Sequence, residues 1–237
     1  MLRTRVITAV FLFAAFFSAL FYLPPAGWLV FVTAIAAIAA WEWGGLMRLS
    51  TVPRIALGVL AVTLCAVLSA VEPEAVGLGT GFSRPAAWRL GAFLYLPAAT
   101  FWLIAVPVWL GQRWSLANPL RGLVTGLVVI LPTWLALVQL RQAGALALLA
   151  IMVVVWLADI GAYFAGRRFG KHKLAPGISP GKTWEGAIGG GIAVLAYGFL
   201  LSSRLPVVLA ENPVLLFVVL IALTSISVVG DLFESPL

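Results

Sequence analysis

The sequence predicts an all-α, polytopic integral membrane protein with about eight transmembrane helices. The chain is 63% hydrophobic, has a mean hydropathy of +1.11 and contains only 10% charged residues, which places it far from the composition of soluble globular proteins. Its apolar residues form repeated runs of roughly the 20 residues that a helix needs to cross a bilayer. Because these runs are continuous, they lack the in-and-out alternation of a transmembrane β-barrel.

The apolar runs define the expected membrane helices. The first run follows Arg3 and Arg5, as a signal peptide would, but it is long and lacks a small-residue cleavage site, so we interpret it as a retained helix. No internal repeat is visible, and we expect a single membrane domain over residues 1–237. The expected spans are Val6–Leu23, Gly27–Leu46, Arg54–Val71, Leu90–Leu110, Gly122–Leu140, Ala143–Ala162, Gly186–Leu201 and Pro213–Val229.

The distribution of basic residues predicts the orientation. The net charge of +7 is explained by the excess of Lys and Arg in cytoplasmic loops, and no basic patch interleaved with aromatics suggests nucleic acid as a partner. We expect both termini in the cytoplasm of a bacterium, with Arg84, Arg89, Arg141 and Arg204 outside. The basic residues expected inside are Arg3, Arg5, Arg48, Arg54, Arg113, Arg121, Arg167, Arg168, Lys171, Lys173 and Lys182.

A dense group of charged residues falls in residues 158–191, between two apolar runs. A membrane protein does not need ions there, so we expect its chemistry in this segment. Asp159, Tyr163 and Arg167 share one face of a helix, where a local Asp–Arg pair is the alternative to a functional role for Asp159. The charged residues of the segment are Asp159, Arg167, Arg168, Lys171, Lys173, Lys182 and Glu185.

Part of this segment has the features of a phosphate site. Gly181-Lys182-Thr183 looks like the end of a P-loop, but Pro176 stands where that motif needs glycine. We instead expect Ser179 to cap the seventh helix, which would place Lys182 beside free backbone N–H groups that attract phosphate. The following glycines, from Gly186 onward, would admit a ligand or simply allow tight helix packing, and we interpret His172 as a surface residue.

The last apolar run carries a polar stripe. Thr224, Ser227, Asp231 and Glu234 recur at helical spacing among Leu, Ile and Val. Interhelical hydrogen bonds account for the two hydroxyl residues but leave the carboxylate of Asp231 unexplained. Asp231 is therefore the acidic residue for which we most expect a function.

The charged segment resembles phosphatidate cytidylyltransferases, also called CDP-diacylglycerol synthases. Three blocks in the same order carry the resemblance, and the remaining chain resembles the family in hydropathy. The blocks are Ala158-Asp159-Ile160-Gly161-Ala162-Tyr163-Phe164-Ala165-Gly166-Arg167 with Phe169-Gly170-Lys171, then Ile178-Ser179-Pro180-Gly181-Lys182-Thr183-Trp184-Glu185-Gly186, and Gly230-Asp231-Leu232-Phe233-Glu234-Ser235.

The resemblance implies transfer of CMP from CTP to phosphatidate in a bilayer with Mg²⁺, and a second metal ion is left open. Asp231, Lys182 and Asp159 are the expected catalytic residues, with both carboxylates as metal ligands. Substrate contacts are expected from the remaining polar residues of the motifs, and a homodimer is left open as the assembly. These residues are Ser179, Lys182, Thr183, Arg167, Lys171 and Glu185.

The resemblance ends before the family signature is complete. Ser235-Pro236-Leu237 matches its beginning, whereas its later Lys-Arg, Lys-Asp, His-Gly-Gly and Asp-Arg elements do not follow, so we expect a domain truncated at its C-terminal end. An inactive truncated homologue is therefore one alternative. The others are a CTP-dependent kinase for a lipid alcohol of the dolichol or phytol type, and a membrane transporter, which would place its charges near the membrane midplane.

Overall fold

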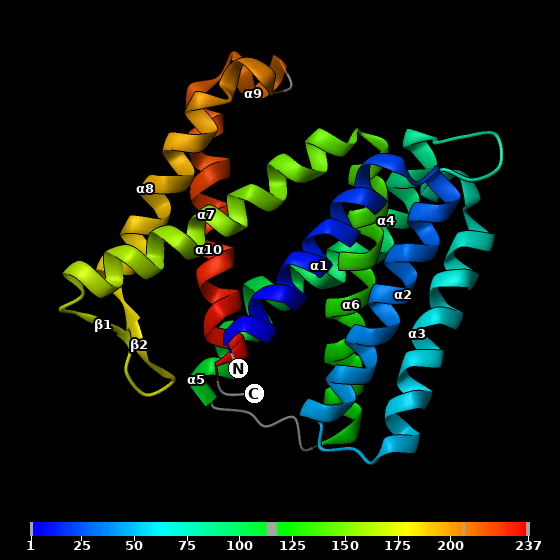
Figure 1. Ribbon diagram of the computed structural model, residues 1–237, viewed down its shortest axis with the longest axis horizontal. Helices are drawn as coiled ribbons and strands as arrows, with labels where there is room; N and C mark the ends of the chain where they lie inside the picture. The colour runs from blue at the N-terminus through cyan, green and yellow to red at the C-terminus, as the bar shows by residue number, and fades with distance from the viewer. Residues whose placement is uncertain (1, 113–117, 206, 236–237) are drawn as a thin grey trace. The chain divides into compact units, whose positions relative to one another are not determined.

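The computed structural model describes residues 2–112, 118–205 and 207–235. Pro236 and Leu237, which match the beginning of the family signature together with Ser235, lie outside the described residues. The chain is helical apart from a two-stranded sheet, which confirms the all-α class (Figure 1). The elements are α1 (Leu2–Tyr22), α2 (Pro25–Leu46), α3 (Thr51–Val71), η1 (Pro73–Val76), α4 (Arg84–Thr100), η2 (Phe101–Ala105), α5 (Val106–Gln112), α6 (Pro119–Gln142), α7 (Ala145–Phe169), β1 (Lys173–Ala175), β2 (Ser179–Thr183), α8 (Trp184–Leu200), η3 (Ser202–Arg204), α9 (Val207–Ala210) and α10 (Pro213–Glu234).

Six helical segments among the described residues are long and apolar enough to cross a membrane. The expected count of eight is not confirmed, because the apolar part of α1, Val6–Tyr22, and all of α8 are shorter. The expected sixth span ends too early: α7 continues past Ala162 to Phe169, so Asp159 and Arg167 belong to one long helix. Six spans suffice to make this a multi-pass membrane protein.

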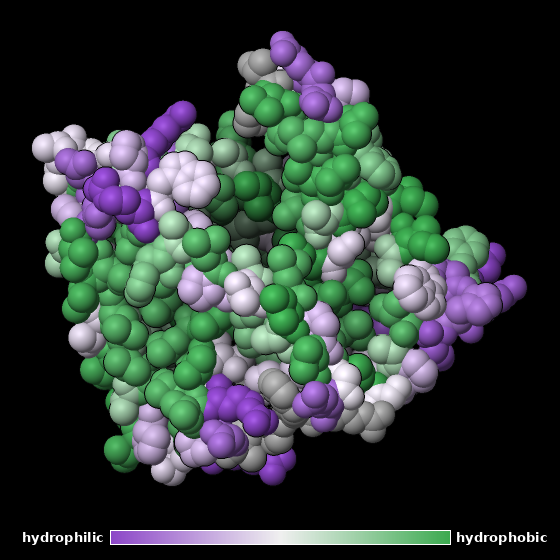
Figure 2. Space-filling view, turned by 180° about the vertical axis from the view of Figure 1, so that it is seen from behind, coloured by the Kyte–Doolittle hydropathy of each residue, from purple (hydrophilic) through white to green (hydrophobic). Residues whose placement is uncertain are grey.

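The surface of the protein is that of a molecule surrounded by lipid. Many large apolar side chains are exposed, including Phe11 at 75%, Leu103 at 67% and Phe164 at 65%. Figure 2 shows hydrophobic side chains over most of the visible face. A water-soluble protein of this size rarely exposes so much contiguous apolar surface, so the exposure supports the membrane assignment.

The described residues form two compact units. The first comprises Met1–Phe101 and Ser115–Leu148, and the second comprises Trp102–Trp114 and Leu149–Leu237. Our expectation of a single membrane domain stays a prediction. All the motif residues singled out from the sequence belong to the second unit.

The core of the first unit is built around buried tryptophans. Trp28 donates its indole N–H to the Leu137 carbonyl at 3.2 Å, Trp43 to the Gly122 carbonyl at 2.8 Å, and Trp134 to the Thr33 hydroxyl at 3.0 Å. Each bond satisfies a donor that would be costly to bury alone. These contacts fasten α6 to α2 from one end of the helix to the other.

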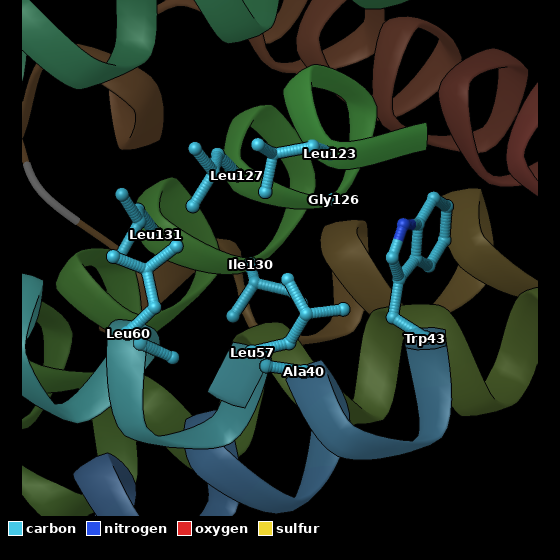
Figure 3. A pocket seen from close by; sticks show the side chains of 10 residues that line it. Ala40, Trp43, Leu57, Leu60, Leu123, Gly126, Leu127, Ile130 and Leu131 are labelled. Carbon is cyan, nitrogen blue, oxygen red and sulfur yellow. The ribbon is translucent and has the colours of Figure 1, made fainter. Parts of the chain in front are cut away.

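A small apolar cavity lies where α2, α3 and α6 meet (Figure 3). Its volume is about 20 Å³, roughly enough for one water molecule but without the polar partners that a buried water needs. We therefore interpret the first unit's interior as a scaffold. The cavity is lined by Ala40, Trp43, Leu57, Leu60, Ala61, Leu123, Gly126, Leu127, Ile130 and Leu131.

The second unit depends on very close packing of α7 against α8. A Cβ atom added at Gly190 would lie 2.6 Å from the Ala158 carbonyl oxygen, and one added at Gly186 would lie 2.9 Å from the Ala162 carbonyl oxygen. The two helices therefore touch backbone to backbone and run antiparallel, as small residues permit in membrane proteins. Of the two uses weighed for these glycines, helix packing is the one that the structure shows.

We expect Gly190→Ala to destabilise the protein by about 1–3 kcal/mol, because the added methyl group has no room against the α7 backbone. Gly191→Ala is the matched control, since its new methyl group would be 3.8 Å from the Thr224 side chain, an ordinary contact. Both substitutions raise helix propensity equally. Thermal unfolding in one detergent compares them, and equal stability of the two variants would contradict the packing account.

Candidate active site

A β-hairpin connects α7 to α8 at one end of the second unit. Its strands β1 and β2 are antiparallel, with Lys173 opposite Thr183 and Ala175 opposite Ser179. The turn between them is closed by an Ile178 N–H bond to the Ala175 carbonyl at 3.0 Å, and Pro176 occupies a turn position that its fixed φ suits. Our expectation that Ser179 caps a helix is wrong: Ser179 lies in β2, and α8 begins only at Trp184.

Thr183 is the residue that caps α8. Its hydroxyl oxygen accepts a bond from the Gly186 N–H at 3.1 Å, and the residue is 7% exposed. Its side chain packs where Gly166 of α7 and Gly170, just beyond that helix, leave room, since a Cβ at Gly166 would be 3.1 Å from the Thr183 hydroxyl. Thr183 thus joins the hairpin to both helices, and the position of the cap follows from this packing.

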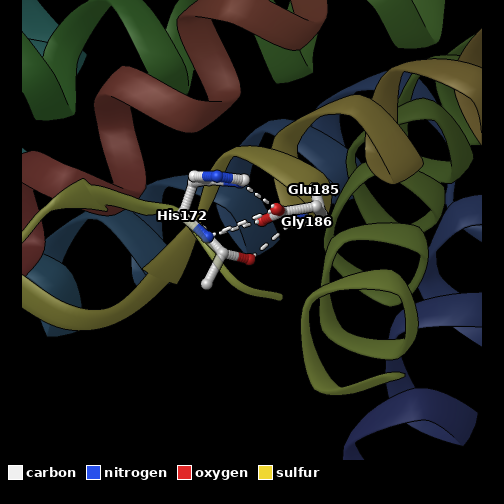
Figure 4. Close-up of polar contacts among 4 residues, drawn as sticks. His172, Glu185 and Gly186 are labelled. Atoms are coloured by element: carbon white, nitrogen blue, oxygen red, sulfur yellow. Dashed lines mark hydrogen bonds and ion pairs between the residues drawn. The ribbon is translucent and has the colours of Figure 1, made fainter. Parts of the chain in front are cut away.

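Glu185 anchors the other strand of the hairpin. Its carboxylate accepts bonds from the His172 backbone N–H, at 3.2 Å to each oxygen, and lies 2.7 Å from His172 Nδ1 (Figure 4). Hydrogen bonds from its own backbone N–H and from His172 lower the pKa of Glu185 to about 2. The His172 ring is exposed, as expected for a surface residue, and a substrate contact by Glu185 stays a prediction.

A pocket of about 400 Å³ opens beside the hairpin. Lys182 and Asp231 form an ion pair across it, with side chains 39% and 35% exposed. The two residues are separated by 49 positions in the chain, so the fold brings the second and third motif blocks together. The pocket is lined by Ala162, Tyr163, Gly166, Arg167, Leu174, Ser179, Gly181, Lys182, Thr183, Gly186, Ala187, Val228 and Asp231.

The structure separates Asp159 from Arg167. Arg167 donates to the Tyr163 hydroxyl at 2.8 Å, and within the described ranges no ion pair joins it to Asp159. Asp159 is exposed and is not part of the pocket lining, but the charges of Asp231 and Lys182 act on its carboxylate. It therefore lies outside the pocket wall, near enough to the Lys182–Asp231 pair for their charges to reach it.

An aromatic cluster holds the end of α10 that carries Asp231. Phe233 is 2% exposed and meets Trp102 and Trp109 edge to face, with ring centroids 5.6 and 5.5 Å apart. Residues 231 and 233 point to different sides of a helix. The aromatic cluster therefore contacts the face of α10 that carries Phe233, while Asp231 faces the pocket. The sequence analysis missed these tryptophans and the pocket residue Val228, and it named Tyr163 only as part of a helix face. The seven-residue spacing of Trp102 and Trp109, which places both on one helix face, was the sequence signal that could have identified them.

The polar stripe expected on α10 is only partly buried. Thr224 is buried and its hydroxyl bonds to the Leu220 carbonyl at 2.9 Å, whereas Glu234 is exposed. Thr224 approaches Gly191 of α8. The stripe therefore faces α8 at Thr224 and the pocket at Asp231, but it does not continue to Glu234.

The two carboxylates suit one kind of metal site. Among the residues described, no three His, Cys, Asp or Glu side chains lie close enough to enclose an ion. Mg²⁺ does not require such an enclosure, because it is commonly held by one or two carboxylates together with substrate phosphates. Asp231 and Asp159 fit a metal of that kind, which arrives with or binds beside a phosphate ligand.

The fold and pocket define the class of the protein: a multi-pass membrane protein with a pocket lined by the charged residues Arg167, Lys182 and Asp231. The chain belongs to the cytidylyltransferase family, whose family model matches residues 3–237, and it is a nucleotidyltransferase. No solved structure matches it significantly.

Named relatives agree with this assignment. A phosphatidate cytidylyltransferase of Haemophilus influenzae is 34% identical over 250 residues, covering 99% of this chain and 85% of the relative. One of Pseudomonas aeruginosa is 38% identical over 198 residues, covering 80% of this chain and 66% of the relative. A third, of Brucella suis, is 45% identical over 92 residues, or 39% of this chain and 33% of the relative.

We expect Thr183→Ala to destabilise the protein by about 1 kcal/mol, because it removes the helix cap. Thr183→Ser keeps the oxygen and is the control. Hydrogen exchange at the Gly186 amide, measured without substrates, reports the cap directly. If the Ala and Ser variants exchange equally fast, the hydroxyl does not hold the start of α8.

The anchor between Glu185 and His172 should survive mild acid. A carboxylate with a lowered pKa stabilises the folded state fully above its unfolded value of 4.5, and this contribution is lost as the pH falls through about 2. We expect the His172 amide to keep its exchange protection from neutral pH down to about pH 4, after correction for intrinsic rates. Glu185→Gln should remove it and Glu234→Gln should not; loss of protection already near pH 5 would contradict the lowered pKa.

Proposed function

We propose that this protein is a phosphatidate cytidylyltransferase, which transfers CMP from CTP to phosphatidate and releases CDP-diacylglycerol and pyrophosphate in phospholipid biosynthesis. The observation that carries the proposal is the meeting of Lys182 and Asp231 in one pocket. Both come from sequence blocks that resemble the family, and two of the relatives that bear this activity's name match most of the chain.

The reaction calls for charge neutralisation more than for acid–base catalysis. A phosphate oxygen of phosphatidate, already anionic, attacks the α-phosphorus of CTP, and the bond from that phosphorus to the bridging oxygen of the β-phosphate breaks as pyrophosphate leaves. The obstacle is the mutual repulsion of two polyanions, which fixed cations relieve. Lys182 and Arg167 line the pocket and supply positive charge where the phosphates would meet.

Individual residues then have distinct proposed roles. Lys182 binds a substrate phosphate, and Ser179, which also lines the pocket, donates a hydrogen bond to one. Arg167 binds a second phosphate, and its hydrogen bond to the Tyr163 hydroxyl orients the guanidinium for this contact. A bound Mg²⁺ would be held by Asp231 and Asp159 and would supply further neutralisation of phosphate charge.

The structure supports the remaining three expected substrate contacts less directly. Lys171 is not part of the pocket lining, and Glu185 is engaged with His172. Thr183 lines the pocket, although its hydroxyl already caps α8. Roles for these three in substrate binding stay predictions, and any such contact would have to compete with the structural bonds of Glu185 and Thr183.

We also propose a cytoplasmic site in a bacterial inner membrane. The antiparallel packing of α7 and α8 puts the hairpin at the membrane end where both helices meet, together with the C-terminal turn of α10. The basic residues of this end favour the cytoplasmic side, where CTP is available. The N-terminus on that side, a homodimer and the absence of a nucleic-acid partner stay predictions.

We expect Asp231→Asn and Lys182→Met each to lower turnover by about 100-fold or more, the usual loss when a fixed charge is removed from a transition state. Glu234→Gln is the matched control, because this acid lies on the same helix turn but is exposed and outside the pocket lining. Pyrophosphate release from CTP and phosphatidate in reconstituted vesicles measures turnover. Near-normal activity of Asp231→Asn would remove its proposed role.

The position of a label in CTP separates this activity from the lipid-alcohol kinase. With CTP labelled at the α-phosphate, a cytidylyltransferase yields a labelled lipid that contains CMP. With label at the γ-phosphate, a kinase labels its lipid and a cytidylyltransferase releases all label as pyrophosphate. Label in lipid only from γ-labelled CTP would overturn the proposal.

A further inference from the structure

Three basic side chains lie outside the pocket where the end of α7 leads through a short loop into β1. Arg168, Lys171 and Lys173 are all exposed. None of them forms an ion pair with a residue in the described ranges, because the nearby Glu185 pairs with His172 and Asp231 pairs with Lys182. These three side chains thus carry positive charge that no carboxylate of the described residues pairs with.

These cations do not point into the pocket. Arg167, Leu174 and Lys182 line it, whereas Arg168, Lys171 and Lys173 do not. Successive side chains of a strand point to opposite faces, so Lys173 lies on the face of β1 opposite to the pocket residue Leu174. A ligand of these cations would therefore be distinct from the substrate held by Lys182.

The loop lies at the depth of lipid headgroups. The 25 residues of α7 make a helix of about 37 Å, somewhat longer than the hydrocarbon core of a bilayer, so its last turn and the loop beyond it emerge among the headgroups. Phe169 is 62% exposed and Trp184 is 55% exposed beside the loop. Exposed aromatic rings next to basic residues are typical of a membrane–water interface.

Interactions within the protein explain only some of these basic residues. The C-terminal dipole of α7 favours a cation such as Arg168 in its last turn, and the Arg168 guanidinium lies 5.5 Å from the Phe169 ring centroid. Neither effect reaches Lys173, which stands in β1 beyond the helix. Its charge, like that of Lys171, is left for a ligand outside the protein.

We propose that Arg168, Lys171 and Lys173, with Phe169 and Trp184, form a basic hairpin surface that binds anionic phospholipids of the surrounding leaflet. The bound lipids are not the substrate. They hold the hairpin and the pocket mouth at the headgroup layer, and in an active enzyme they raise turnover. The lipid-binding part is independent of the proposed function, whereas the effect on turnover rests on it.

Lipid retention tests the binding part without any enzyme assay. The full chain is purified with mixed phosphatidylglycerol and phosphatidylcholine, and retained lipids are counted by native mass spectrometry. We expect R168Q/K173Q to retain several-fold less phosphatidylglycerol than the wild type, with phosphatidylcholine unchanged. The charge-preserving control R168K/K173R should retain the wild-type amount. Equal phosphatidylglycerol retention by R168Q/K173Q and the wild type would overturn the proposal.

Activity in vesicles tests the functional part. At fixed phosphatidate and CTP, adding phosphatidylglycerol to phosphatidylcholine vesicles should raise wild-type turnover several-fold, and salt should reduce this stimulation by screening. R168Q/K173Q should keep the activity seen in pure phosphatidylcholine but lose the stimulation.

Two outcomes of the vesicle assay would each contradict one of the two proposals without deciding the other. A raised KM for CTP in R168Q/K173Q, measured in pure phosphatidylcholine, would assign the cations to the nucleotide and overturn the lipid surface. An inactive wild type in all vesicles would contradict the proposed function, while the retention measurement would still decide whether the basic hairpin surface binds lipid.

Discussion

The backbone contact between α7 and α8 is the constraint on which the site depends. Gly161 and Gly190 let two membrane helices approach until a single added methyl group would collide with a carbonyl oxygen. That approach fixes the separation of the two ends that the hairpin joins, and hence where Lys182 emerges. In lipid no hydrophobic force drives helices together, so this close fit supplies the packing and dispersion energy that holds them.

Polar contacts hold the hairpin at each of its two strands. Thr183 caps the start of α8 and packs against Gly166 of α7 and the following Gly170, while Glu185 accepts hydrogen bonds from His172 before the first strand. The end of α10 is held separately, because Phe233 packs edge to face against Trp102 and Trp109. The ionisable residues of the pocket are thus placed by contacts that are themselves uncharged or locally neutralised.

Hydropathy predicted the helical membrane fold, because the need to satisfy backbone hydrogen bonds in lipid leaves an apolar run few alternatives. It did not predict the hairpin. Ser179 and Pro180 are common at helix starts, and only the cross-strand bonds and the burial of Thr183 move the start of α8 to Trp184. The count of eight spans is not confirmed for a related reason: the apolar part of α1 and the whole of α8 are short, and composition alone does not set where a helix stops.

The candidate site was predictable where charge stood out against an apolar background. Lys182 and Asp231 were identified because membrane segments rarely carry ions without a use, and the structure places them together. Trp102 and Trp109 were not, because an aromatic residue in an apolar run looks the same whether it faces lipid or another ring. Tyr163 was noticed only as part of a helix face, and its bond to Arg167 depends on side-chain geometry that spacing does not give.

The ion pair in the pocket has a consequence for the order of events during binding. Lys182 and Asp231 are each other's counter-ion, so an anion that binds the lysine must compete with the aspartate. A nucleotide that brings a divalent cation would supply a partner for both residues, whereas a small monovalent anion would offer nothing to the carboxylate. Under the proposed function, this exchange of partners would favour the nucleotide over the simple anions of the cell.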